Sequence, residues 1–220
     1  WSDTNQQYDA PQRLATGADG AAHILTGSTA SSWVLQIADS ETTSPAGDID
    51  VRVKLNFNGS IFSTVSAIAS KFGASGNRSW RFETTTTGAL FFGWSANGST
   101  LIDKTSTEVL SGAQLTSDVW VRATLDVDNG ASGNDLNFYT SLDGSVWTKL
   151  GTTITTAGTT SIFNSTSTTQ FIGRGTGFLP QQDHAISFFE MEVYASLDGT
   201  ARIVDIDVGS MEFISPIAST

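Results

Sequence analysis

Residues 119–141 read VWVRATLDVDNGASGNDLNFYTS, two alternating runs joined by a loop rich in Asn, Asp and Gly. In the first run apolar residues alternate with polar ones, and the second run places Leu136 and Phe138 two positions apart. Successive side chains of a strand point to opposite faces of a sheet, so this spacing predicts two half-buried antiparallel strands. Aligning the buried residues sets Leu125 opposite Leu136 and Ala123 opposite Phe138.

The same alternation recurs along most of the chain, whereas helical periodicity is nearly absent. Residues 48–57 and 78–85 each alternate apolar with polar side chains, which predicts further strands. The alternation in residues 187–193 predicts that Phe189 faces the core and that Phe188 faces outward. Shorter runs predict edge strands and a closing strand at residues 22–25, 32–38 and 208–214.

Many strands with regular turn signals and no helices predict one all-β domain, an antiparallel two-sheet β-sandwich or jelly roll. Residues 1–20 are polar and are expected to form an N-terminal arm, and residues 21–220 the single sandwich domain. Three Asx-Gly pairs, Asn97-Gly98, Asp143-Gly144 and Asp198-Gly199, sit in similar Ser-containing phrases. These pairs tolerate the positive φ of tight turns, so we expect the same turn three times.

The composition favours a folded core and argues against several kinds of site and partner. The 220 residues are 39% hydrophobic, which is enough apolar surface for a core, and they include no Cys for disulfides or thiolate metal sites. The net charge is −11, with 22 acidic and 11 basic residues and no basic block. Nucleic acids and anionic membranes both require Lys/Arg patches, so neither is expected as a partner.

The series ASKF (69–72), NRSWRF (77–82), GALFFGWS (88–95), WVRATLDVDNG (120–130) and FYTSLDGSVW (138–147) resembles the concanavalin A-like lectin/glucanase superfamily. It is most similar to laminin-G-like jelly rolls of the kind seen in structural proteins of tailed bacteriophages. The resemblance extends from about residue 48 to residue 212, so it covers most of the chain.

The resemblance implies a non-enzymatic virion surface protein, either a capsid decoration or a minor tail module. It implies a place on the outside of the particle, multiple copies, capsid or tail subunits as partners and host-cell carbohydrate as a ligand. The fold also carries lectins and glycanases. Two alternatives therefore stand beside this expectation: a carbohydrate-binding module of a larger secreted bacterial protein, and a glycanase.

Catalysis by a glycanase needs two carboxylates across a groove. Glu190 and Glu192 alternate on one strand face, which is the nearest approach to the glucanase pattern. The third acid of that pattern is missing, because residues 194–196 are Tyr, Ala and Ser. We therefore expect no enzyme activity, with the two Glu residues serving as solubilising charge.

Calcium is the one metal that the resemblance suggests, because laminin-G-like domains often hold it with loop oxygens. Asp126, Asp128, Asn129 and Asp135 gather around one loop and are the candidate ligands. Turn formation accounts for the same Asp-Asn-Gly residues equally well. No cofactor is expected.

A carbohydrate site combines aromatic rings with planar polar groups, because sugar C–H faces stack on π surfaces while hydroxyls need hydrogen bonds. The hairpin register places Trp120, Arg122 and Thr124 beside Ser141, Tyr139 and Asn137, respectively, on the outer face, and Tyr194 is expected to join them. The same patch is also compatible with a contact to another protein. It is equally compatible with a structural role, in which Trp120 tucks under a loop and Arg122 covers it.

Overall fold

The computed structural model describes residues 39–59, 62, 65–167 and 186–207, together with the backbone of 14–16, 22–24, 35–37 and 169–171. The predicted closing strand 208–214 lies outside the described residues. So does most of the predicted arm 1–20, of which Leu14–Thr16 forms the short strand β1.

The larger of two sheets has nine strands in the order β1-β2-β14-β4-β9-β10-β11, with β12 paired to β10 and β15 paired to β14. All the pairings are antiparallel. Its strands are β1 (Leu14–Thr16), β2 (Ala22–Ile24), β4 (Ile49–Asn56), β9 (Val119–Asp126), β10 (Gly133–Ser141), β11 (Thr148–Lys149), β12 (Ile154–Ala157), β14 (Ser187–Tyr194) and β15 (Arg202–Asp207).

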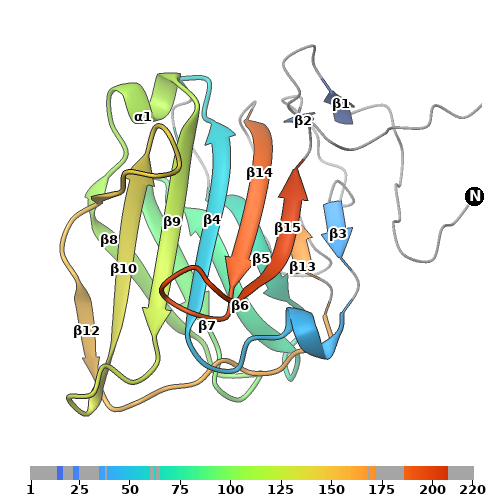
Figure 1. Cartoon of the computed structure of the whole chain (residues 1–220), viewed down its shortest axis with the longest axis vertical. Helices are drawn as coiled ribbons and strands as arrows, with labels where there is room; N and C mark the ends of the chain where they lie inside the picture. The colour runs from blue at the N-terminus through green and yellow to red at the C-terminus, as the bar shows by residue number, and fades with distance from the viewer. Residues whose placement is uncertain are drawn as a thin grey trace, which may run out of the picture.

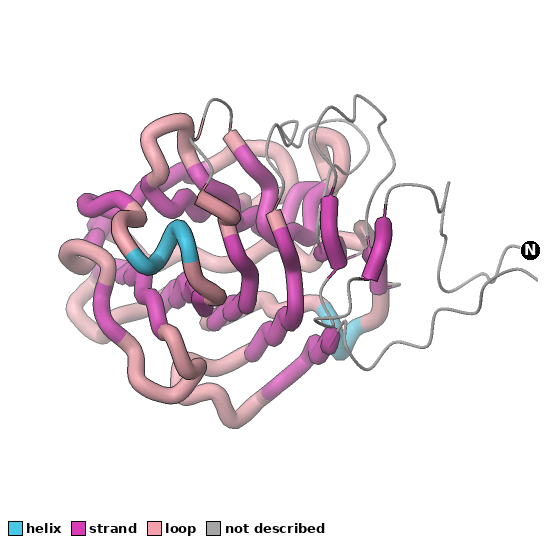
Figure 2. The backbone as a smooth tube through the Cα atoms, turned by 90° about the horizontal axis from the view of Figure 1, so that it is seen from above, coloured by secondary structure: helices cyan, strands magenta, loops and turns pink. Residues whose placement is uncertain are grey.

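The smaller sheet has six antiparallel strands in the order β3-β13-β5-β6-β7-β8. They are β3 (Leu35–Ile37), β5 (Ser66–Phe72), β6 (Arg78–Thr84), β7 (Ala89–Trp94), β8 (Ile102–Val109) and β13 (Thr169–Phe171). The two sheets lie one behind the other as two layers (Figures 1 and 2). Short helical turns, η1 (Glu41–Thr43) and α1 (Ala113–Thr116), lie in the connections. The fold is therefore an antiparallel two-sheet β-sandwich of jelly-roll type, as the alternation predicts.

The register of the β9–β10 hairpin is the predicted one, with Leu125 opposite Leu136 and Ala123 opposite Phe138. The inward side chains of both sheets form one core. Across that core the rings of Phe82 and Phe138 stack with their centroids 6.4 Å apart, which joins the six-stranded sheet to the nine-stranded one. The core residues from β4 and β9 are Ile49, Val51, Val53, Leu55, Val119, Val121, Ala123 and Leu125.

Two details differ from the sequence-based expectation. The alternation predicts an outward Phe188, but this residue is fully buried in the core, because β14 carries a bulge. Phe188 pairs with Leu55 and Glu190 with Lys54, so Phe189 is an extra residue that reverses the alternation before it. The strand at Ala22–Ile24 is also not an edge, since β1 and β14 flank it, whereas β3 is one.

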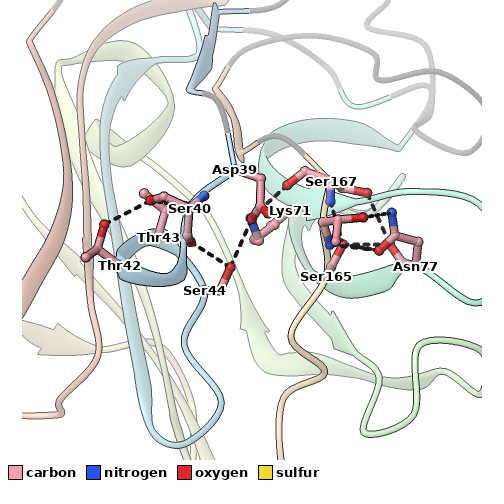
Figure 3. Close-up of polar contacts among 10 residues, drawn as sticks. Asp39, Ser40, Thr42, Thr43, Ser44, Lys71, Asn77, Ser165 and Ser167 are labelled. Atoms are coloured by element: carbon pink, nitrogen blue, oxygen red, sulfur yellow. Dashed lines mark hydrogen bonds and ion pairs between the residues drawn. The ribbon is translucent and has the colours of Figure 1, made fainter.

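A polar clamp ties three distant segments together at one side of the sandwich (Figure 3). The fully buried Lys71 on β5 donates through Nζ to Asp39 Oδ1 at 2.6 Å and to the carbonyl oxygen of Ser167 at 2.7 Å. The hydrogen bond from Lys71 lowers the pKa of Asp39 below its usual value. Beside it, Asn77 accepts hydrogen bonds from Ser165 Oγ and from the backbone N–H of Thr166.

Within the part of the chain that the structure describes, none of the helices has the length and apolar character needed to span a membrane.

Candidate functional site

The outer face of the nine-stranded sheet carries a charged centre where β4 lies between β14 and β9. Asp50 is fully buried there, between the guanidinium groups of Arg52 and Arg122. Arg122 donates to Asp50 from Nε (2.8 Å) and Nη2 (2.7 Å), and Arg52 from Nε (3.1 Å) and Nη2 (2.7 Å). Charge-assisted bonds of this kind compensate the loss of hydration of a buried carboxylate.

Three aromatic rings surround the two guanidinium groups. Arg122 lies 5.1 Å from the ring centroid of Tyr139 and 5.2 Å from that of Trp147. Arg52 lies 4.5 Å from the centroid of Tyr194 and 5.6 Å from that of Trp147. Each contact is within cation–π range, and Trp147 is shared by both cations. We call Asp50, Arg52, Arg122, Tyr139, Trp147 and Tyr194 the arginine–aromatic cluster.

Burial and neighbouring charges shift the pKa values of two groups in this cluster, Arg52 and Tyr194. Burial alone would lower the pKa of Arg52, but the hydrogen bonds and negative charge of Asp50 raise it above its usual value. Burial and the neighbouring Glu192 raise the pKa of Tyr194. Both groups therefore keep their usual charge state near neutral pH.

Two loops contribute to the cluster: Trp147 lies in the loop that joins β10 to β11, and the loop that joins β14 to β15 contacts Arg122. In the β14–β15 loop the carbonyl oxygen of Leu197 accepts a hydrogen bond from Arg122 Nη2 at 3.1 Å. A Cβ on Gly199 would lie 2.5 Å from Arg52 Nη2, and one on Gly144 would lie 2.8 Å from Trp120 Nε1. Both glycines have φ near +70°, so close approach and backbone conformation together require glycine.

Two of the three predicted turns share one pattern of hydrogen bonds. The third, in the β14–β15 loop, differs, because Asp198 Oδ1 accepts from the backbone N–H of Thr200 while the N–H of Ala201 donates to Ser196 Oγ. In the β10–β11 loop Asp143 Oδ1 accepts from the backbone N–H of Ser145 and of Val146, both at 2.8 Å. These bonds hold the pKa of Asp143 far below its usual value. Asn97 Oδ1 accepts in the same pattern from Ser99 and Thr100 in the copy between β7 and β8.

The β10–β11 loop also presents apolar side chains to solvent. Leu142 is 63% exposed and Val146 is 70% exposed, and both flank the Asp143 turn. Among the described residues the one other exposed large hydrophobic side chain is Val109, at 45% on β8. Two of the three are therefore on the loop that precedes Trp147.

Of the five residues predicted to bind carbohydrate, Arg122, Tyr139 and Tyr194 lie in the arginine–aromatic cluster. The hairpin has the predicted register, with Arg122 opposite Tyr139, Trp120 opposite Ser141 and Asn137 opposite Thr124. Tyr194 lies on β14, beyond β4, and is 7% exposed beneath Arg52. Gly144 packs on the Trp120 ring, so this tryptophan lies under the β10–β11 loop. This is the arrangement expected if the role of Trp120 is structural. Arg122 covers Tyr139 and Trp147 instead.

Sequence reasoning missed four residues of this face: Asp50, Arg52, Trp147 and Lys149. Asp50 and Arg52 occupy the polar positions of an alternating strand, so their outward direction was visible in the sequence. The sequence did not show that they lie beside Arg122, because β4 and β9 are neighbours in the sheet but distant in the chain. Lys149 donates to Asn137 Oδ1 at 2.7 Å and lies 5.8 Å from the Tyr139 ring centroid.

The calcium candidates use their oxygens in the turn itself. Asp126 and Asp128 accept from backbone N–H groups two residues ahead. Asn129 Oδ1 accepts from the backbone of residues 131 and 133, and its Nδ2 donates to Asp135 Oδ1 at 3.0 Å. Within the described ranges there is no group of three or more His, Cys, Asp or Glu side chains that could hold a metal ion.

Glu190 and Glu192 lie on the outer face of β14 and both are paired with cations. Glu190 is 3.4 Å from Lys54, and Glu192 is 3.2 Å from Arg202 and 3.9 Å from Arg52. On β15, Asp207 pairs in register with Glu190 and Asp205 with Glu192. Two further carboxylates therefore lie next to Glu190 and Glu192. They come from the neighbouring strand β15, whereas the glucanase pattern places its acids on one strand.

No family model matches the chain, and no curated protein matches its sequence. Solved structures match it in fold. A structure of botulinum neurotoxin type C, from work on its cell entry through interaction with two ganglioside molecules, matches with TM-score 0.55 and 12% identity over 89% of this chain and 42% of that one. The binding domain of serotype C1 matches with TM-score 0.54 and 11% identity, over 89% and 43%.

The binding domain of botulinum neurotoxin DC in complex with rat synaptotagmin II gives TM-score 0.54 and 14% identity, over 93% of this chain and 43% of that one. The chain therefore spans less than half the length of these toxin structures. At such low identity the likeness is one of fold.

Proposed function

We propose that this chain is a non-enzymatic carbohydrate-binding module that acts on the surface of a bacteriophage virion, as a capsid decoration or a minor tail protein. In this proposal it is present in multiple copies, its protein partners are capsid or tail subunits, and its ligand is a host-cell glycan. The observation that carries the binding role is the fixed position of Tyr139 and Trp147 beside Arg122, Asn137 and Lys149.

These residues supply both parts of a sugar site. The rings offer apolar surface to the C–H face of a pyranose, and the guanidinium, amide and ammonium groups offer hydrogen bonds to its hydroxyls. The turn at Asp143 and the contact of Gly144 with Trp120 hold the neighbouring loop in place. A site ordered before the ligand arrives loses less conformational entropy on binding.

The comparisons support the binding class at a coarse level. The similar folds include toxin binding domains, one described through gangliosides and another in complex with a protein receptor. The virion role rests on the resemblance of residues 120–130 and 138–147 to domains of tailed-bacteriophage structural proteins.

A glycan array probed with the purified chain tests the binding role. We expect a defined set of glycans to bind, and we expect Trp147→Ala to weaken binding by at least tenfold, since one ring–sugar contact of about 1.4 kcal/mol gives that factor. Val109→Ser, which changes an exposed apolar residue on the other sheet, is the matched control. Absence of binding to every glycan at millimolar concentration would overturn the proposal.

The virion role needs a separate experiment. An antibody against the chain is expected to label intact particles in electron micrographs at regular capsid or tail positions. Absence of labelling on particles whose proteins include the chain would contradict a surface location.

The second candidate is a carbohydrate-binding module of a larger secreted bacterial protein. It would use the same arrangement of Tyr139 and Trp147 beside Arg122, in a protein without a virion role. Recovery of the sequence inside a longer secreted polypeptide, and not in particles, would support this candidate over the first.

A further inference from the structure

The outer face around Tyr139 is cationic, although the chain has a net charge of −11. Arg122 on β9 and Lys149 on β11 are the two cross-strand partners of Tyr139, one on each side. Their charges lie 5.1 Å and 5.8 Å from its ring centroid. A ligand that stacks on Tyr139 would therefore have a positive charge on either side.

The hydrogen-bonding groups that remain free at this point are donors. Arg122 uses Nε and Nη2 for Asp50 and Leu197, and no hydrogen bond from its Nη1 occurs within the described part of the chain. Lys149 Nζ uses two of its three protons, for Asn137 Oδ1 and Thr153 Oγ1.

The side-chain acceptors of Asp50 and Asn137 on the same surface are already occupied. Both carboxylate oxygens of Asp50 receive guanidinium protons, and this side chain is fully buried. Asn137 Oδ1 accepts from both Lys149 and Thr153, which leaves the Nδ2 protons as the part of this amide that can meet a ligand. A surface that offers donors and positive charge selects a ligand rich in acceptors and negative charge.

Apart from Asp50, which is fully buried between Arg52 and Arg122, the negative groups of the sheet strands lie away from this point. Asp126 and Asp135 pair with each other across the β9–β10 hairpin, one outward position beyond Asn137. Glu190 and Glu192 lie on β14, on the far side of β4, and are paired with cations. The cationic stretch is therefore bounded at the Asn137 end and is centred on Tyr139.

We propose that this site takes an acidic saccharide, whose carboxylate or sulfate lies between Arg122 and Lys149 and whose ring stacks on Tyr139 and Trp147. The inference rests on the proposed carbohydrate-binding function and specifies the class of sugar. Carboxylate and sulfate share the chemistry that the site recognises, and different sugars carry them, so the experiment separates the two.

The test compares three oligomers of equal length by isothermal titration calorimetry: oligogalacturonate, oligogalactose with a hydroxymethyl group at each carboxylate position, and sulfated oligogalactose. We expect at least one acidic oligomer to bind about tenfold more tightly than the neutral one, as for one added charge-assisted hydrogen bond. We also expect that preference to shrink as salt is raised.

Lys149→Gln is the informative variant, because this side chain is exposed on a two-residue strand and is not bonded to Asp50. It is expected to reduce binding of the acidic oligomer several-fold and of the neutral oligomer much less. Lys104→Gln, on β8 of the other sheet, is the control and should change neither.

Each result has a distinct meaning. Equal affinity for acidic and neutral oligomers, or equal loss of both in Lys149→Gln, would overturn the inference and leave the binding function standing. Binding to no oligomer here and to no glycan on the array would overturn the function itself.

Discussion

The carboxylate of Asp50 accepts two hydrogen bonds from the guanidinium of Arg122, at 2.8 Å from Nε and 2.7 Å from Nη2. Arg122 faces Arg52 directly across the β4–β9 pair, a juxtaposition of like charges that would be unfavourable without an anion. Asp50 therefore makes it possible for the sheet to hold two arginines side by side beneath Trp147.

Asp50→Asn is expected to destabilise the protein by about 3–5 kcal/mol, because it leaves the partly buried Arg122 without its counter-charge and Arg52 with only the more distant Glu192. Urea denaturation measures the change. Glu190→Gln is the control, since its pair with Lys54 is partly exposed and should contribute only about 0–1 kcal/mol. Equal stability of the two variants would show that the cluster does not depend on the charge of Asp50.

Asp143→Ala is expected to weaken glycan binding several-fold, because it removes the acceptor that orders the loop carrying Trp147. Asp143→Asn should retain binding, because Asn97 makes the same two backbone contacts in the equivalent turn. Calorimetry on both variants is the measurement. If the Asn variant lost as much affinity as the Ala variant, then the charge at position 143 would matter and not the order of the loop.

Glu83 is expected to make stability depend on pH. Its side chain is 2% exposed on β6, and burial raises its pKa from 4.5 to about 7, with Asp103 adding to the rise and Arg81 opposing it. Between these values the folded protein holds a proton that the unfolded chain releases. The free energy of unfolding should therefore fall by about 3 kcal/mol as pH rises from 4.5 to 7, and then level off.

Thermal unfolding from pH 4.5 to 8 tests this expectation with Glu83→Gln, which should remove most of that decline and stabilise the protein at pH 8. Glu108→Gln, exposed on β8, should keep the decline. A Glu83→Gln profile parallel to that of the unmodified protein would refute the assignment to Glu83.

Phe138→Ala is expected to cost about 3–5 kcal/mol, because Phe138 is fully buried and stacks on Phe82 of the opposite sheet. Leu142→Ala, four residues further along at an exposed position, should change stability by about 0.5 kcal/mol or less. Denaturant midpoints distinguish the two. A small effect of Phe138→Ala would mean that the sheets are not held together at this contact.

The alternation of apolar and polar residues along the sequence predicted most of the fold. It placed Leu125 opposite Leu136 because one face of the hairpin had to be apolar, and a slip of one residue would have exposed that face. It failed at Phe188, where a bulge inserts Phe189 and inverts the two faces. Both residues are phenylalanine, so hydrophobicity gave no signal for which of them turns inward.

The site was predictable where it depends on one hairpin and unpredictable where it depends on distant strands. Arg122, Tyr139 and Asn137 follow from the hairpin register. Asp50 lies beside them because β4 pairs with β9 in the sheet. The order of the strands along the chain does not reveal that pairing. Trp147 follows a loop whose path depends on contacts with Trp120 and the Asp143 turn.

The contact of Lys71 with Asp39 and with the Ser167 carbonyl has a consequence for how the sandwich responds to force. Residues 39, 71 and 167 are far apart in the chain, yet one ammonium group joins them. Pulling the segment ahead of β4 away from β5 would leave that ammonium buried without its counter-ion, which is energetically costly. Separation of these three segments should therefore be energetically unfavourable as long as Lys71 stays buried.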